Sequence, residues 1–189
     1  MSTIIALYDA CVLYPAPLRD ILMHLALTDL FRAKWSATIH EEWIRNVLDA
    51  RPDLRRQQLE RTRSLMDAYV RDCLVEGYES LIESIELPDP NDRHVLAAAI
   101  VSKADFIITF NQKDFPRIAL QPYNIETRHP DTFISWLMDI APGAVCVAAK
   151  RHRDSLKKPP KCVNEYLDTL GRQGLPETVA RLREYAELI

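Results

Sequence analysis

Glycine and cysteine are scarce in this sequence, and it has no long hydrophobic run. Four glycines and twelve prolines favour a mostly helical chain with short strands. The four cysteines include no C-x-x-C pair, which argues against a zinc site and a disulfide framework. The N-terminus shows neither a basic leader nor a cleavage site, and no apolar run reaches membrane-spanning length. We therefore expect a cytoplasmic protein with no membrane contact.

The sequence also lacks an excess of positive charge. Its formal net charge is −3, so no overall positive field would attract a nucleic acid. An RNA ligand would have to be held by local basic patches or by bound metal. With 189 residues, 48% of them hydrophobic and 27% charged, the chain suits one globular domain and an appendage.

Polar side chains follow two apolar segments of strand length. Residues 3–8 lead directly into Asp9, and residues 104–109 end in Thr109, with Asn111 and Asp114 following. In open α/β sheets, ligands bind at the carboxyl ends of the strands. We therefore expect these side chains to lie at one edge of a parallel sheet, although a lone Asp9 could also cap a helix.

Two further acidic positions each offer a choice between neighbouring residues. Asp89 and Asp92 both precede an alanine-rich helix, and either can cap it; they could divide the roles, with Asp89 capping and Asp92 binding metal. Either Ser36 or Thr38 could be the N-cap of the helix that contains HEEW; a capping box with Thr38 would occupy Glu41 and leave Glu42 without a structural role.

The rest of the sequence predicts further elements and one boundary. A short strand is expected over residues 85–87 and an edge strand over 124–128, while the arginine-rich residues 52–70 predict a helix that could contact a phosphate backbone. The break at residues 141–143 predicts a domain boundary, followed by helices over 144–156, 161–170 and 176–188. The basic residues 150–161 suit a solvated linker, an RNA contact or a docking surface.

Four segments together resemble the PIN domain, and more narrowly the VapC-like toxins of bacterial toxin–antitoxin systems. They are YDACVLYP, HEEW, DPNDRHVLAAAI and ITFNQKDF. The resemblance implies an α/β fold with three α/β/α layers, a short central parallel sheet of about four or five strands, and additional C-terminal helices. It places a PIN-like nuclease domain at residues 1–141 and a helical extension at 142–189.

The resemblance also assigns roles to the acidic residues. It implies that Asp9, Glu42, Asp92 and Asp114 bind metal, with Asn111 and Thr109 orienting a water molecule or a ligand. Carboxylate oxygens without Cys or His partners select Mg²⁺ or Mn²⁺, as one ion or two. This sequence departs from many relatives at Cys11, where they have asparagine, and at Asn111, which adds no charge.

The implied function is a metal-dependent endoribonuclease, the toxin of a toxin–antitoxin pair. A metal-activated water would hydrolyse an RNA phosphodiester bond and leave a 5′-phosphate. The implied partners are tRNA or ribosomal RNA as substrate, an antitoxin that covers the site, and a second copy of the chain in a homodimer. The alternative is a PIN-like module that binds RNA or a partner without cleaving it.

Overall fold

A five-stranded parallel sheet forms the centre of the computed structural model, which describes residues 3–189. The strands are β1 (Ile5–Tyr8), β2 (Arg32–Ser36), β3 (Leu74–Val75), β4 (Phe106–Ile108) and β5 (Glu126–Arg128), in the spatial order β3-β2-β1-β4-β5. The apolar run of β1 is the middle strand, and its residues Ala6, Leu7 and Tyr8 are fully buried. Such a run suits a strand covered on both faces.

Ten α-helices and four 3₁₀ turns surround the sheet in the described residues. The helices are α1 (Ala10–Leu13), α2 (Ala16–Ala26), α3 (Ala37–Ala50), α4 (Arg56–Tyr69), α5 (Arg93–Ser102), α6 (Arg117–Leu120), α7 (Pro130–Ile140), α8 (Pro142–Ser155), α9 (Val163–Gly171) and α10 (Pro176–Arg183). The 3₁₀ turns are η1 (Glu79–Ser84), η2 (Pro90–Asp92), η3 (Gln112–Asp114) and η4 (Gln121–Tyr123). None of the helices in residues 3–189 is both long and apolar enough to span a membrane.

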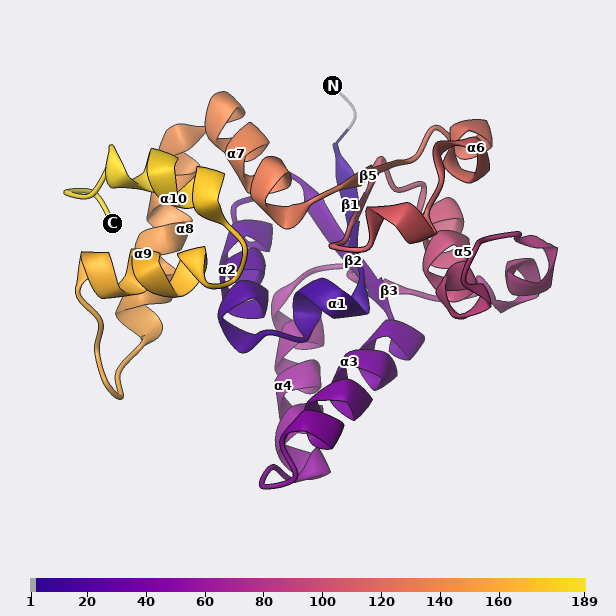
Figure 1. Cartoon of the computed structure of the whole chain (residues 1–189), viewed down its shortest axis with the longest axis horizontal. Coiled ribbons are helices and arrows are strands. Elements are labelled where there is room, and N and C mark those ends of the chain that lie inside the picture. The colour runs from indigo at the N-terminus through magenta and orange to yellow at the C-terminus, as the bar shows by residue number, and fades with distance from the viewer. Residues whose placement is uncertain (1–2) are drawn as a thin grey trace.

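Helices lie on both sides of the sheet (Figure 1). Helix α5 contacts β1, β2, β3 and β4, and its buried Ala97, Ala98 and Ala99 allow a close approach because their side chains are small. On the other side, α2 packs against α8, and the Tyr8 hydroxyl of β1 donates to the Leu22 carbonyl of α2 at 3.2 Å. The predicted α/β class, parallel sheet and C-terminal helices are confirmed.

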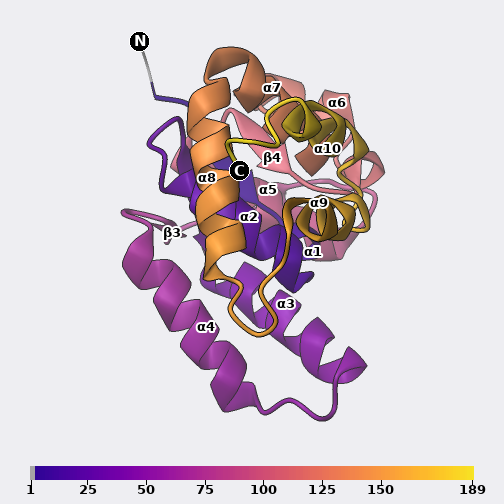
Figure 2. The same ribbon diagram turned by 90° about the vertical axis from the view of Figure 1, so that its left-hand side faces the viewer.

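The C-terminal helices pack onto the same body as the sheet. Figure 2 shows α8 lying along α2, with α9 and α10 beside it. Between α2 and α8, the rings of His24 and His152 stack with their centroids 5.5 Å apart. Helices α7 and α8 are separated by Ala141 alone, at the predicted break. The division of the chain at residues 141 and 142 stays a prediction.

Two local predictions are wrong. Residues 85–87 form no strand, and the edge position of the sheet belongs to Leu74 and Val75, which pair with Trp35 and Ser36. Of the two predicted N-caps of helix α3, Ser36 is the one observed, because its hydroxyl accepts from the Ile39 N–H at 3.2 Å; the capping box between Thr38 and Glu41 does not form.

Candidate active site

The candidate site lies where the order of the strands reverses. Strand β1 pairs with β2 on one side and with β4 on the other. The strands that follow β1 in the sequence are therefore added first on one side of it and then on the other. A crevice at the carboxyl ends of the strands is the usual binding position in such sheets. Asp9 follows β1 directly and donates its N–H to the Ile108 carbonyl of β4 at 3.1 Å. This bond places Asp9 beside the residues that follow β4.

Asp9 is a buried carboxylate held by three donors. Its Oδ1 accepts from the Ala10 N–H at 2.7 Å, and its Oδ2 accepts from the Thr109 hydroxyl at 2.6 Å and the Cys11 thiol at 3.1 Å. Burial raises the pKa of Asp9, and the charge of Glu42 raises it further, while the bonds from Thr109 and Cys11 oppose the rise. The carboxylate is therefore held in one orientation within reach of the charge of Glu42.

Thr109 supports Asp9 through its hydroxyl. It is fully buried, and its hydroxyl accepts from the Asn111 N–H at 2.9 Å while donating to Asp9. The Thr109 hydroxyl thus orients Asp9, a predicted metal ligand, and a role of Thr109 toward a water molecule stays a prediction. Cys11 accepts from the Phe110 N–H at 3.3 Å, and burial raises the pKa of its thiol to about 12, so the thiol stays a hydrogen-bond donor at neutral pH.

The negative charges of four other carboxylates act on Asp92. Its pKa is raised to about 7, first by burial and then by the negative charges of Asp9, Asp89, Asp114 and Glu42. The negative charges of the other three predicted acidic residues and of Asp89 thus all act on Asp92, and we call these five residues the acidic cluster. No hydrogen bond from a helix N-terminus engages the Asp92 side chain.

Asp89 and Asp92 divide their roles. Asp89 Oδ1 accepts from the Asn91 N–H at 2.8 Å and so caps the turn η2. The Asp92 side chain makes no capping hydrogen bond, so it remains available to the acidic cluster. Sequence reasoning treated Asp89 only as a cap or a competitor and missed its contribution to the field at Asp92; the three-residue spacing of the two acids was the available signal.

Glu41 and Glu42 point in different directions, because successive residues of a helix lie about 100° apart around its axis. Glu41 pairs with Arg56 and with Arg63 of α4, the latter at 3.2 Å. Glu42 instead acts on Asp9 and Asp92, and its Oε2 lies 3.3 Å from His94 Nε2. The geometry favours Glu42 over Glu41 as the site residue.

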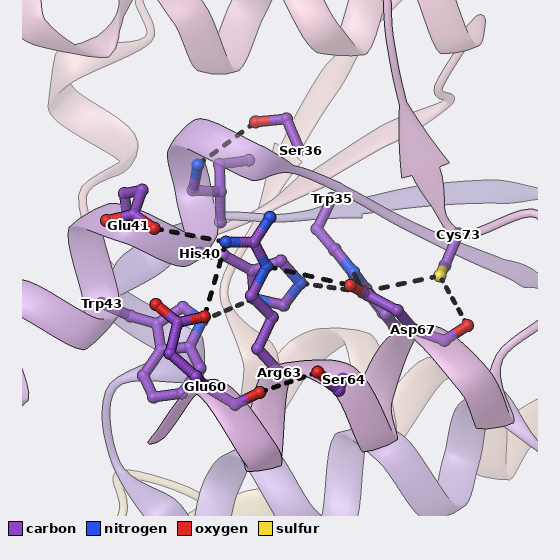
Figure 3. A network of polar contacts seen from close by, with 11 residues as sticks. Trp35, Ser36, His40, Glu41, Trp43, Glu60, Arg63, Ser64, Asp67 and Cys73 are labelled. Atoms are coloured by element: carbon purple, nitrogen blue, oxygen red, sulfur yellow. Dashed lines mark hydrogen bonds and ion pairs between the residues drawn. The ribbon is translucent and has the colours of Figure 1, made fainter. Parts of the chain in front are cut away.

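The arginines of α4 are partly engaged within the arm formed by α3 and α4. Figure 3 shows Arg63 beside Glu41, Glu60 and Asp67, and Arg56 also pairs with Glu60 at 3.0 Å. Asp67 accepts from Trp35 Nε1 at 2.8 Å and lies 2.9 Å from His40 Nε2. These contacts fix the arm that carries Glu42, so Arg56 and Arg63 have a structural role.

The carboxylate and amide oxygens of these residues suit a hard cation, although the side chains do not enclose one. Within residues 3–189, no three Asp, Glu, His or Cys side chains are grouped closely enough to enclose a metal ion. Asp114 is half-buried in η3, and Asn111 is exposed just before it. Magnesium commonly binds through one or two carboxylates, several waters and substrate phosphates, and a metal would offset the repulsion that raises the pKa of Asp92. The residues present fit such an ion.

Two domain families and one curated relative match this chain. The PIN domain family matches residues 6–113, and the VapC50 C-terminal domain matches residues 130–184. The chain is 38% identical over 107 residues to "Putative ribonuclease VapC50" of Mycobacterium tuberculosis, in a match that covers 57% of this chain and 62% of that protein. No solved structure matches it. With the PIN match spanning more than half of its length, the chain belongs to the PIN domain family.

Proposed function

We propose that this protein is a Mg²⁺- or Mn²⁺-dependent endoribonuclease of the VapC-like toxin type. The observation that carries the proposal is the position of Asp9, a buried carboxylate at the carboxyl end of β1 that is bonded to β4. Burial and the charges of Asp9, Asp89, Asp114 and Glu42 raise the pKa of nearby Asp92 to about 7. Such a group of like charges is unfavourable without a cation. It lies at the switch point of a parallel sheet, in a chain similar to a protein named as a ribonuclease.

The chain's own residues would position a metal, a water molecule and a phosphate. Asp9, Glu42, Asp92 and Asp114 would hold the ion, and Asn111 would orient the attacking water through its exposed amide. When bound, the metal would lower the pKa of water and neutralise charge on the phosphate. Attack by the water oxygen forms a new P–O bond and breaks the bond to the 3′ oxygen, which takes up a proton. The products carry a 5′-phosphate and a 3′-hydroxyl.

The partners follow from the same proposal. The substrate would be tRNA or ribosomal RNA, an antitoxin protein would cover the acidic cluster, and two copies of the chain would form a homodimer. Location in the cytoplasm stays a prediction, consistent with four cysteines that form no disulfide in the described residues.

The first test is Mn²⁺ binding measured by calorimetry. We expect the wild type to bind Mn²⁺, and Asp9→Asn and Glu42→Gln to lose most of that affinity, because each removes a negatively charged ligand. Glu41→Gln is a matched control, since Glu41 is the neighbouring acid and faces α4. Equal binding by the Glu41 and Glu42 variants would contradict the proposed site.

Cleavage is tested on total tRNA and ribosomal RNA with Mn²⁺. We expect cleavage by the wild type, 5′-phosphate ends on the products, and a loss of at least about 100-fold in rate for Asp92→Asn, as when a group essential to charge stabilisation is removed. A folded wild type that binds RNA, takes up no Mn²⁺ and cuts nothing would favour the binding module instead.

A further inference from the structure

His94 lies against a proposed metal ligand without belonging to the acidic cluster itself. It is the second residue of α5, and its Nε2 is 3.3 Å from Glu42 Oε2 of α3. The His94 side chain is 12% exposed and that of Glu42 is 29% exposed. The contact therefore joins two helices that come from distant parts of the sequence, on the buried side of the Glu42 carboxylate.

The chemistry of the two groups fixes which ring nitrogen carries hydrogen. A carboxylate only accepts hydrogen bonds, so the nitrogen that faces it must be the donor. His94 Nδ1 is buried and has no partner among residues 3–189. A buried N–H without an acceptor is strongly unfavourable, which favours a lone pair at Nδ1 and the hydrogen at Nε2. His94 Nε2, 3.3 Å from the Glu42 carboxylate, is thus the ring nitrogen that can carry hydrogen toward Glu42.

We infer that His94 is a positioning residue that orients Glu42 for metal binding. Glu42 is a long side chain on a helix surface, and holding it in one rotamer has an entropic cost. Asp9 is oriented by Ala10, Thr109 and Cys11, whereas among the described residues the one polar contact recorded for the Glu42 side chain is His94. Partners that orient ligating carboxylates typically change metal affinity by about 10–100-fold when removed. The inference rests on the proposed function.

Two substitutions of His94 by amide residues distinguish its role as a hydrogen-bond donor from its role in packing. The amide nitrogen of glutamine can occupy the position of histidine Nε2, while that of asparagine reaches only the position of Nδ1. We expect His94→Asn to weaken Mn²⁺ affinity by about 10–100-fold in calorimetry. We expect His94→Gln to recover most of that loss, and thermal unfolding to be similar in the two variants.

The outcomes distinguish this inference from the proposed function. Unchanged Mn²⁺ affinity in His94→Asn would overturn the positioning role while leaving the metal site intact. Equal losses in both variants would also overturn it, because packing rather than donation would then be responsible. If the wild type itself binds no Mn²⁺, the proposed function fails first. Cleavage rates on the same variants give a second measure, since a misplaced ligand lowers kcat more than it raises KM for RNA.

Discussion

At the scale of single residues, the charge on Asp92 couples folding to pH. Its pKa in the folded, metal-free protein is about 7, well above its ordinary value of 3.8, so between these values the folded state binds more protons than the unfolded state. Stability contributed by this group is therefore present at low pH and is lost as pH rises through 7. The raised pKa of Asp9 acts in the same direction.

We predict that Asp92→Asn relieves this loss. Without metal, the variant should gain stability relative to the wild type as pH rises from 5 to 8, because a neutral amide carries no charge to be buried or to be repelled by the other carboxylates. Urea unfolding in EDTA at both pH values measures the difference. Burial is the main cause that lowers the pKa of His152 to about 4, so His152 makes the free energy of unfolding rise with pH between about 4 and 6.5. This contribution cancels in the comparison because both proteins contain His152.

Glu86→Gln is the matched control for that comparison. Glu86 is exposed and forms no ion pair with a described residue. Its variant should follow the wild type at both pH values. A constant difference between Asp92→Asn and the wild type across this range would show that the cluster does not repel Asp92.

The site residues differ in how far the sequence could predict them. Asp9 and Asp92 could be predicted because a strand end and a helix start are local features. The role of Thr109 could not, since its hydroxyl direction depends on the pairing of β1 with β4, which lie about a hundred residues apart. Glu42 was separated from Glu41 by resemblance, and the geometry supplies a reason, because of these two glutamates Arg56 and Arg63 pair with Glu41.

At the scale of elements, the α3–α4 arm depends on one half-buried carboxylate. Asp67 of α4 accepts from Trp35 of β2 and contacts His40 of α3 at 2.9 Å, so it connects three elements (Figure 3). Its side chain is 20% exposed, while that of His40 is fully buried. Removing the acceptor would leave the buried indole N–H and the imidazole without their partner.

We predict that Asp67→Ala destabilises the protein by about 1–3 kcal/mol, the usual effect of leaving a buried donor unpaired. Urea unfolding at neutral pH measures it. Glu41→Ala, which breaks exposed ion pairs on the same arm, should lose less than about 1 kcal/mol. A smaller effect for Asp67 than for Glu41 would refute the view that the buried contacts hold the arm.

Strand β3 shows where reasoning from sequence fails at this scale. Leu74 and Val75 form a two-residue strand that is too short to produce a periodic pattern. The apolar Ile85 and Leu87 looked more like a strand, yet they are buried as part of a coil segment. Elements such as α5 and β1 were predicted because their apolar residues extend over several positions.

At the scale of the whole molecule, one buried acid links the C-terminal helices to the domain. Asp131 of α7 accepts from the Thr178 N–H at 2.7 Å and the Glu177 N–H at 2.9 Å, and so caps α10 across 46 residues or more of sequence. Ser135 of α7 also donates to Glu177 at 2.6 Å. The first turn of α10 is therefore fixed to α7, and Arg181 further along the helix adds contacts to Ser135 and Asp139 of α7.

We predict that Asp131→Ala releases α10 without disturbing the acidic cluster. The loss of the cap should destabilise the helix by about 1–2 kcal/mol and raise hydrogen exchange at its amides, while α5 amides stay protected. Exchange measured by mass spectrometry tests this, with Mn²⁺ affinity as the control. Loss of metal binding in this variant would instead link the extension to the site.

The central place of β1 has a consequence for synthesis on the ribosome. Its partner β4 is made about a hundred residues later, so a nascent chain that has emerged only as far as α4 has the side of β1 that faces β4 unpaired. Unpaired strand edges recruit other chains. Asp9 also lacks its Thr109 donor until that point. A chain that ends before residue 109 therefore exposes an unpaired edge of β1 and lacks both Thr109 and Asp114.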